Sequence, residues 1–146
     1  MKIHNIKVSA FFKQDEVENG RLILKQLLGE TPVEEEKLEP ESEGGVFNEP
    51  LTALKATLPS QKEIKLLLDK VFSGLDSEDK SELKQTLDSR IDDDCNLYIR
   101  LGKKSLLEGK MRLHSRDPVH IRIKLAVFPK KKESAISTAL ELLKER

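Results

Sequence analysis

The chain has 146 residues, of which 37% are hydrophobic and 36% are charged, and its formal net charge is zero. This length suffices for one compact core, so we expect residues 1–146 to form a single domain. Cys95 is the only cysteine, which excludes an intramolecular disulfide and a cysteine-based zinc cluster. No stretch approaches the roughly 18 apolar residues of a membrane span, and the N-terminus lacks the apolar run of a signal peptide, so we expect a cytoplasmic protein with no membrane partner.

The zero net charge hides a segregation of charge along the chain. Residues 1–50 contain 6 basic and 11 acidic residues (net −5), residues 51–95 contain 7 and 10 (net −3), and residues 96–146 contain 13 and 5 (net +8). Such asymmetry is typical of a protein whose basic part meets an anionic partner. It equally fits acidic and basic portions that attract each other within the fold, so composition leaves both interpretations open.

The first 29 residues predict a strand followed by a helix. Residues 3–12 are rich in β-branched and aromatic side chains, which favour a strand. Asp15 and Glu18 have the spacing of a capping box, and the apolar stripe that follows them predicts a helix that Gly29 ends.

An acidic segment and a second strand come next. Residues 30–43 contain seven glutamates, which indicates a weak edge strand or a mobile acidic loop. Gly44–Gly45 is a turn signal. Residues 51–58 predict a strand with Leu54, Ala56 and Leu58 on one face, and a proline ends it.

Two helices and an acidic turn occupy the middle of the chain. Ser60 and Glu63 form a second capping-box pattern, and the predicted helix ends at Gly74. Ser77 is placed to cap a shorter helix. Asp92–Asp94 indicates a turn.

The last third predicts three strands, over 97–101, 110–114 and 119–128, and a helix over 133–143. Together the elements predict an α+β fold with two layers. We expect a mainly antiparallel sheet of five to six strands, with helices packed on one face.

The basic residues of 96–146 alternate with apolar residues along these three strands. Because successive side chains on a strand point to opposite faces, neighbouring strands would present their polar sides on one surface. That surface would contain no acidic residue and would consist of Tyr98, Arg100, Lys110, Arg112, His114, His120, Arg122 and Lys124. Like charges opposed across a sheet are destabilising, so the pattern indicates that an anion binds there. A half-exposed strand that is basic only for solubility is the alternative.

Flanking lysines would extend this surface, and arginine and tyrosine suit RNA. Lys103 and Lys104 follow the first strand, and Lys130–Lys132 open the last helix. Guanidinium groups match phosphate, and Tyr98 can stack on a base. The acidic residues 30–43 could instead fold over the surface.

Short motifs follow one another in a fixed order between Arg90 and Pro129: an acidic turn, a strand of the form Leu-Tyr-x-Arg-Leu, a lysine, a connector, a glycine, and an Asp-Pro turn into a basic strand. The residues concerned are Asp92–Asp94, Leu97, Tyr98, Arg100, Leu101, Lys103, Gly109, Asp117 and Pro118. This order resembles an archaeal family of RNA-binding proteins often described as exosome-associated. That family also has a Gly-Asn-Pro-hydrophobic element in mid-chain, and here Glu49 interrupts the corresponding Gly45–Leu51 segment.

The resemblance implies a two-layer fold like that of the L-five ribosomal protein and a role in RNA processing or degradation. From Ser77 onward the predicted order of helix, three strands and helix is also that of a double-stranded RNA-binding domain, in which a lysine cluster opens the last helix and touches phosphates. This second likeness is one of topology, which does not carry function alone.

No catalytic constellation is evident in the sequence. Asp92–Asp94 could be imagined as the magnesium site of a nuclease, but adjacent residues point apart and an aspartate cluster between helix and strand is usually a turn. Cys95 has no histidine partner nearby and is expected in the core. His114 and His120 lie on the basic surface, where they would act as hydrogen-bond donors. We expect no enzyme activity, no cofactor and no metal.

The sequence therefore predicts a protein that captures structured RNA by its phosphates, with exosome or ribosome-related proteins as further partners. The residues expected to contact RNA are Tyr98, Arg100, Lys103, Lys104, Lys110, Arg112, His114, His120, Arg122, Lys124, Lys130, Lys131 and Lys132. The alternative is a protein-interaction module, or a homodimer, that uses the same basic face.

Overall fold

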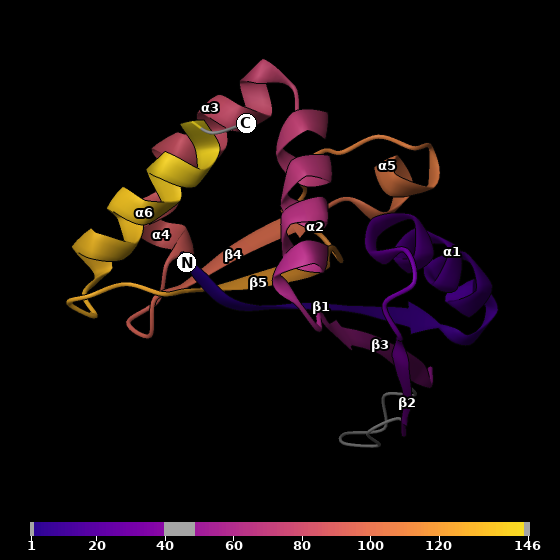
Figure 1. The fold of residues 1–146 in the computed structure, drawn as a ribbon. Helices are drawn as coiled ribbons and strands as arrows, with labels where there is room; N and C mark the ends of the chain where they lie inside the picture. The colour runs from indigo at the N-terminus through magenta and orange to yellow at the C-terminus, as the bar shows by residue number, and fades with distance from the viewer. Residues whose placement is uncertain (1, 40–48, 145–146) are drawn as a thin grey trace, which may run out of the picture.

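The computed structural model describes residues 2–39 and 49–144, and its elements confirm the predicted α+β class (Figure 1). In chain order they are β1 (Ile3–Lys13), the 3-10 turn η1 (Gln14–Glu16), α1 (Val17–Leu28), β2 (Glu34–Leu38), β3 (Leu51–Thr57), α2 (Gln61–Gly74), α3 (Ser77–Gln85), α4 (Leu87–Arg90), β4 (Asn96–Leu101), α5 (Lys103–Leu107), β5 (Val119–Leu125) and α6 (Lys132–Lys144).

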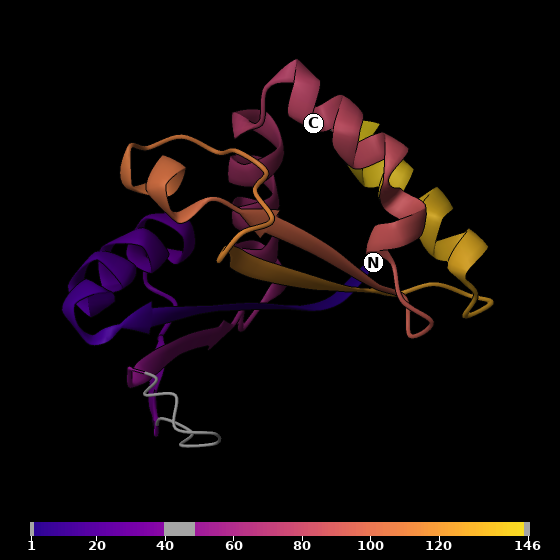
Figure 2. The ribbon, with the colours of Figure 1, turned by 180° about the vertical axis from the view of Figure 1, so that it is seen from behind.

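The strands form one sheet in the order β2-β3-β1-β5-β4, and every neighbouring pair is antiparallel. Figures 1 and 2 show the helices on the same side of this sheet from opposite viewpoints, so that none of the described helices covers the other face. The two predicted layers, helices on one face of an antiparallel sheet, are therefore confirmed. The longest helix described here, α2, has 14 residues, and none of the described helices is long and apolar enough to cross a bilayer.

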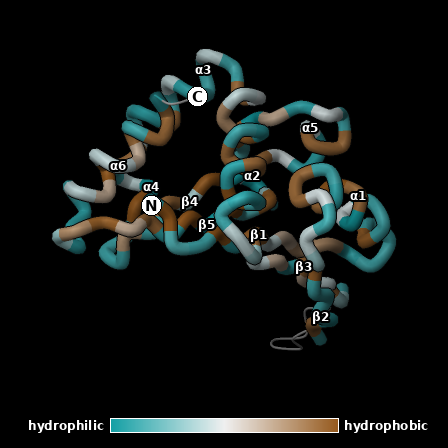
Figure 3. The backbone as a smooth tube through the Cα atoms, viewed as in Figure 1, coloured by the Kyte–Doolittle hydropathy of each residue, from teal (hydrophilic) through white to brown (hydrophobic). Residues whose placement is uncertain are grey.

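The core fills the space between the sheet and the helices. In β1 the side chains of Ile6, Val8, Ala10 and Phe12 are buried, while the residues between them are half-buried or exposed. Alternation of this kind places one face of a strand in the core. Figure 3 shows the apolar residues gathered along the central strands and on the helix turns that face them. Each large apolar side chain that is removed from water in this way contributes about 1.5–3 kcal/mol.

Only some of the residues that were predicted to begin or end a helix do so. Asp15 lies in the 3-10 turn, and Glu16 precedes α1 without a side-chain capping bond. Asp76, rather than Ser77, caps α3, because its carboxylate accepts the N–H of Asp79 at 2.8 Å. Ser60 does begin α2, but its hydroxyl donates to the Glu63 carboxylate and makes no capping bond to the helix backbone. Gly29 ends α1 as predicted, with a positive φ of 59°.

The acidic segment is an edge strand where the structure describes it. Glu34–Leu38 forms β2, at the opposite edge of the sheet from β4. Glu35 accepts two hydrogen bonds from Arg21 of α1, which holds this edge to the helix layer. The remaining residues 40–43, the Gly44–Gly45 turn and most of the Gly45–Leu51 element lie outside the described residues.

The predicted strand over 110–114 is wrong. After β4 the chain forms the short helix α5, and only the single bridge between Leu101 and Leu113 connects the following segment to the sheet. In this bridge the N–H of His114 donates to the backbone oxygen of Arg100, and the N–H of Gly102 donates to that of Arg112, both at 3.0 Å. The N–H of Leu113, which lies between them, donates to the Asp79 carboxylate of α3 at 3.1 Å. Both views show this segment on the helix side of the sheet (Figures 1 and 2). The order of helix, three strands and helix is therefore not present, because two strands follow Ser77.

Candidate nucleic-acid interface

The polar side chains of four strands lie together on the side of the sheet that none of the described helices covers, in rows that run across the strands. In one row Lys7 stands between Thr57 and Arg122, and Arg122 stands opposite Tyr98. In the next, Ser9 stands between Lys55 and His120. Directly opposed side chains on one face of an antiparallel pair are neighbours in space. We call this surface the open face; it consists of Asn5, Lys7, Ser9, Lys55, Thr57, Asn96, Tyr98, Arg100, His120, Arg122 and Lys124.

A groove of about 730 Å³ runs over the open face. Its walls come from β1, β3, β5 and β4, and Glu34 of the acidic edge strand lies at its margin. The side chains that line it include Lys7, Lys55, Tyr98, His120 and Arg122. The described part of the acidic segment therefore borders the groove and leaves the basic centre of the open face uncovered.

The cations at the centre of the open face have no acidic partner among residues 2–39 and 49–144. Lys55 pairs with Glu36 at 3.2 Å, at the β2 side. Lys7 and Arg122 are directly opposed across β1 and β5, yet neither forms an ion pair with a described residue. Like charges opposed in this way destabilise a sheet unless an anion lies between them.

Three polar atoms on the open face are buried and have no hydrogen-bond partner among the described residues. They are Oδ1 of Asn5, Oδ1 of Asn96 and Nε of Arg122. Asn5 and Asn96 stand on either side of Lys124, two residue pairs along the strands from Arg122. A buried polar atom without a partner costs about 1–3 kcal/mol, so the fold keeps this polar cluster at a cost in stability.

His120 is a half-buried side chain on the open face. Burial, together with the charges of Arg100 and Lys103, lowers the pKa of His120, and the charge of Asp117 opposes this only in part. The imidazole is therefore predominantly neutral at pH 7 in the free protein.

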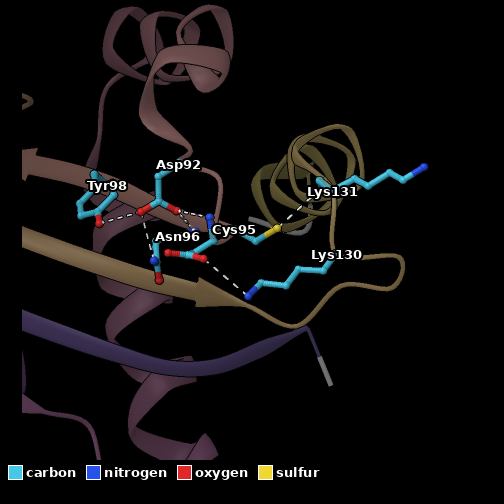
Figure 4. Close-up of polar contacts among 7 residues, drawn as sticks. Asp92, Cys95, Asn96, Tyr98, Lys130 and Lys131 are labelled. Atoms are coloured by element: carbon cyan, nitrogen blue, oxygen red, sulfur yellow. Dashed lines mark hydrogen bonds and ion pairs between the residues drawn. The ribbon is translucent and has the colours of Figure 1, made fainter.

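The acidic turn before β4 organises Tyr98 (Figure 4). Asp92 accepts hydrogen bonds from the N–H groups of Asp94 and Asn96, from the Asn96 amide and from the Tyr98 hydroxyl, at 2.9–3.2 Å. Burial opposes ionisation of Asp92, but these four bonds outweigh it and hold the pKa of that carboxyl below its usual value. Burial and the bond to Asp92 raise the pKa of Tyr98. The interpretation of Asp92–Asp94 as a turn is confirmed.

The turn also bears on the predictions for metal ligands and for Cys95. The described residues contain no group of three side chains suited to hold a metal ion. Cys95 follows the turn with a positive φ of 64° and is fully buried, as predicted for a core residue. Its thiol donates a weak hydrogen bond to the backbone oxygen of Lys131 at 3.7 Å (Figure 4).

Five of the thirteen residues predicted to contact RNA lie on the open face: Tyr98, Arg100, His120, Arg122 and Lys124. Lys130 and Lys132 lie beyond the end of β5, within 3.7 Å of Asp94 and 3.6 Å of Asp88, respectively. Lys131 is exposed beside them. The lysine cluster at the start of α6 is thus partly neutralised by the acidic residues before β4.

The other five predicted residues lie between Lys103 and His114, after the end of β4. Lys103 is held by an ion pair with Asp117 at 2.9 Å, by the backbone oxygen of Phe11 and by the ring of Phe12, whose centroid is 4.2 Å away. Arg112 lies 3.8 Å from Asp76, at the start of α3. The remaining three, which are exposed, are Lys104, Lys110 and His114. They do not share the surface of β5, because residues 110–114 do not form a sheet strand.

Sequence reasoning missed the contribution of β1 and β3 to this surface. Asn5, Lys7 and Ser9 alternate with buried apolar residues of β1, and Lys55 and Thr57 do so in β3. The same alternation that marked the basic strands was therefore present. What the sequence lacked was the strand order, which inserts β1 between β3 and β5.

Comparison with known proteins finds a matching family model and several relatives. A family model described as RNA binding matches residues 5–125. RNA-binding protein PAB1135 of Pyrococcus abyssi (strain GE5 / Orsay) is 26% identical over 149 residues, which cover 98% of this chain and 95% of that protein. Two solved structures share the fold: protein AF2318 from Archaeglobus fulgidus (TM-score 0.84, 27% identity, 97% of this chain and 99% of that one) and Mth689, a DUF54 protein from Methanothermobacter thermautotrophicus (0.79, 26%, 98% and 99%). The chain belongs to this RNA-binding family.

Proposed function

We propose that the protein binds RNA on the open face of its sheet, through phosphate contacts and without catalysis. Membership of the RNA-binding family and the name of the Pyrococcus abyssi relative support RNA as the ligand. The observation that carries the choice of surface is the opposition of Lys7 and Arg122 with no acidic partner among the described residues.

The polar cluster on the open face suits a ligand that carries both acceptors and donors. A phosphate oxygen would accept from the buried Nε of Arg122 and would separate the charges of Arg122 and Lys7. The 2′-hydroxyl of a ribose, which both donates and accepts, would satisfy the carbonyl oxygens of Asn5 and Asn96. Binding would remove costs that the free protein bears, and these costs make the open face a better candidate than an ordinary solvated surface.

The mode of binding that this surface supports depends on RNA shape rather than on base sequence. Lysine and arginine contacts to phosphate carry no base code. Tyr98 offers a ring beside Arg122, but its hydroxyl is held by Asp92, so the ring contributes stacking rather than a further hydrogen bond. We therefore expect structured RNA to bind, with modest discrimination between sequences.

Of the residues predicted from the sequence, we assign the first contacts to Arg100, Arg122, Lys124, His120 and Tyr98, together with the newly found Lys7. The exposed Lys131 would extend the surface beyond β5. Lys103 and Arg112 are assigned no direct contact, because each already has an acidic partner.

A role in RNA processing or degradation, and an association with exosome or ribosome-related proteins, are expectations that follow from the family resemblance. The likeness to the L-five ribosomal protein fold is of the same kind. A non-catalytic role agrees with a surface whose hydrogen-bonded carboxylate, Asp92, has all of its described bonds within its own turn and strand.

The proposal is tested by titrating labelled hairpin RNA and single-stranded RNA at several salt concentrations. The test variant carries Lys7→Glu and Lys124→Glu on the open face. The control carries Lys104→Glu and Lys110→Glu, which change the net charge equally at exposed positions after the end of β4. If four phosphates are neutralised, the slope of log affinity against log salt is about −3 to −4 for the parent.

The open-face variant should bind at least tenfold more weakly with a shallower slope, while the control should lose affinity much less. Equal losses in both variants would mean that total charge, and not the open face, governs binding. No binding by the folded parent would reject the proposal. In that event sedimentation of parent and variants would show whether the face joins two copies of the chain.

A further inference from the structure

A second cavity, of about 330 Å³, lies at the β4 edge of the sheet. One wall is formed by α3, α4 and the residue between them, and the other by the segment after α5. The residues that line it are Glu82, Thr86, Ser89, Arg90, Arg100, Leu113, His114 and Ser115. A cavity of this size is at the lower end of the range for small-ligand sites.

Two arginines meet at this cavity without a counter-charge in contact. Arg90 is half-buried, and its Nε donates to the Thr86 hydroxyl at 2.7 Å. Neither Arg90 nor Arg100 forms an ion pair with any residue in the described part of the chain. Glu82 is the only acidic residue on the wall, so the two arginines exceed it in charge. Burial lowers the pKa of Arg90, the charge of Glu82 opposes this effect, and the charge of Arg100 adds to it; Arg90 remains charged in the physiological range.

Several side chains that line the cavity have hydrogen-bond donors that no described residue accepts. The hydroxyls of Thr86 and Ser89 already donate to backbone oxygens at 2.8 and 3.0 Å. The side chains of Arg100, His114 and Ser115 make no hydrogen bond to the residues that the structure describes. Two guanidinium groups, an imidazole and a hydroxyl that converge on one space suit a ligand with several negatively charged oxygens.

Arg100 connects this cavity with the open face. It stands opposite His120 in the register of β4 and β5, and it also lines the cavity. A strand of RNA that crosses the open face toward β4 would therefore reach the cavity at the sheet edge.

We propose that the cavity between Arg90, Arg100 and His114 holds a phosphate group of the RNA whose backbone lies on the open face. This inference rests on the proposed function and extends it to a discrete phosphate site at the β4 edge. The phosphate is either an internal phosphodiester or the phosphate at a strand end, which share the same recognition chemistry. Arg90 is the distinguishing residue, because it contributes nothing to the open face itself.

The test compares RNA affinity and stability in Arg90→Gln with those in Lys84→Gln, which removes one charge from an exposed position of α3 outside the cavity. The probes are a 12-nucleotide RNA with a 5′-phosphate and the same RNA with a 5′-hydroxyl. Arg90→Gln should weaken binding about tenfold and reduce the salt slope by about 1, whereas Lys84→Gln should have little effect. Because Arg90 is half-buried beside another cation, the free Arg90→Gln protein should unfold at the same temperature as the parent or higher.

Comparison of the two RNAs shows whether the bound phosphate is internal or lies at the strand end. A loss for both RNAs assigns an internal phosphate, and a loss only for the 5′-phosphorylated RNA assigns the strand end. His114→Glu, at an exposed position, gives a second variant that should fold normally and repel a phosphate from the same cavity. Unchanged affinity in folded Arg90→Gln and in His114→Glu would overturn the inference. The open-face variant Lys7→Glu with Lys124→Glu would still lose binding in that case, so the two failures are distinguishable.

Discussion

The hydroxyl of Tyr98 donates a hydrogen bond of 2.9 Å to Oδ2 of Asp92, and this bond ties the middle of β4 to the turn that precedes it (Figure 4). Oδ1 of the same carboxylate accepts the N–H groups of Asp94 at 3.0 Å and Asn96 at 2.9 Å. One side chain therefore shapes the turn, starts β4 and orients the aromatic ring on the open face. The described hydrogen bonds of Asp92 therefore all lie within the turn and β4.

Replacing Asp92 should destabilise the protein without abolishing RNA binding by the folded form. Asp92→Asn leaves one acceptor oxygen for four donors, so we expect a loss of about 2–3 kcal/mol in the free energy of unfolding. Tyr98→Phe removes one bond and should cost about 1 kcal/mol. Since the pKa of Asp92 is lowered in the fold, its stabilisation is present above pH 3.8, its ordinary value, and is lost as the pH falls through the lower folded value.

Urea unfolding at pH 7 and at pH 3 measures both effects. The difference between the parent and Asp92→Asn should be smaller at pH 3. A difference that is equal at the two pH values would show that the charge of Asp92 contributes nothing.

Gly20 and Gly74 should respond differently to alanine, because different side chains face them. A Cβ on Gly20 would lie 2.7 Å from the ring of Phe12, which is buried beneath α1 and cannot move aside. A Cβ on Gly74, at the end of α2, would meet the flexible and half-buried Met111 at 2.6 Å. We expect Gly20→Ala to cost about 1–3 kcal/mol, and Gly74→Ala to be close to neutral. Thermal unfolding of both variants checks this, and equal melting temperatures would contradict it.

The sequence was sufficient to predict the elements whose structure is decided by local signals. The alternation in 97–101 and 119–128 predicted β4 and β5, and the apolar stripes predicted α1, α2 and α6 within a few residues. It was also sufficient to place Cys95 in the core and to recognise Asp92–Asp94 as a turn.

What the sequence could not supply was the arrangement of groups that are distant along the chain. Residues 110–114 alternate like a strand, yet their pairing with β4 is limited to the bridge between Leu101 and Leu113, and the N–H of Leu113 donates to Asp79 of α3. The contribution of Lys7 to the open face depends on β1 lying between β3 and β5, which no local pattern encodes. The Arg90 cavity likewise exists only because α4 packs beside the edge of β4.

Lys103 should act on stability rather than on RNA affinity, although its place in the sequence suggests an RNA contact. Its ammonium group is largely buried, 2.9 Å from Asp117 and 4.2 Å from the centroid of the Phe12 ring. Lys103→Gln should lower the free energy of unfolding by about 1–2 kcal/mol, since partly buried charge pairs and cation–π contacts contribute on this scale.

The same variant should leave the RNA dissociation constant of the folded protein within about twofold of the parent, with an unchanged salt slope. Lys104→Gln, at the exposed neighbouring position, is the matched control and should alter neither quantity much. If the Lys103→Gln protein is fully folded and its salt slope is shallower than that of the parent, Lys103 breaks its ion pair with Asp117 and binds phosphate in the complex.

His120 should make stability and RNA affinity respond to pH in opposite directions. His120 stands opposite Arg100 of β4 and Ser9 of β1, and its pKa is lowered by burial and by the charges of Arg100 and Lys103, with Asp117 acting in the opposite direction. A histidine with a lowered folded pKa binds fewer protons than the unfolded chain. The stability of the free protein is therefore full above pH 6.5 and falls as the pH drops through 6.5 toward the folded value.

RNA phosphates on the open face would favour the protonated imidazole, so binding should take up a proton. Affinity should therefore rise by about threefold or more between pH 7.5 and pH 5.5, even though the free protein becomes less stable over the same range. His120→Gln should remove most of this rise, whereas His4→Gln, at an exposed position, should preserve it. If the rise in affinity persists in His120→Gln, the phosphates do not approach His120. The RNA would then cross the open face nearer to β1 and β3.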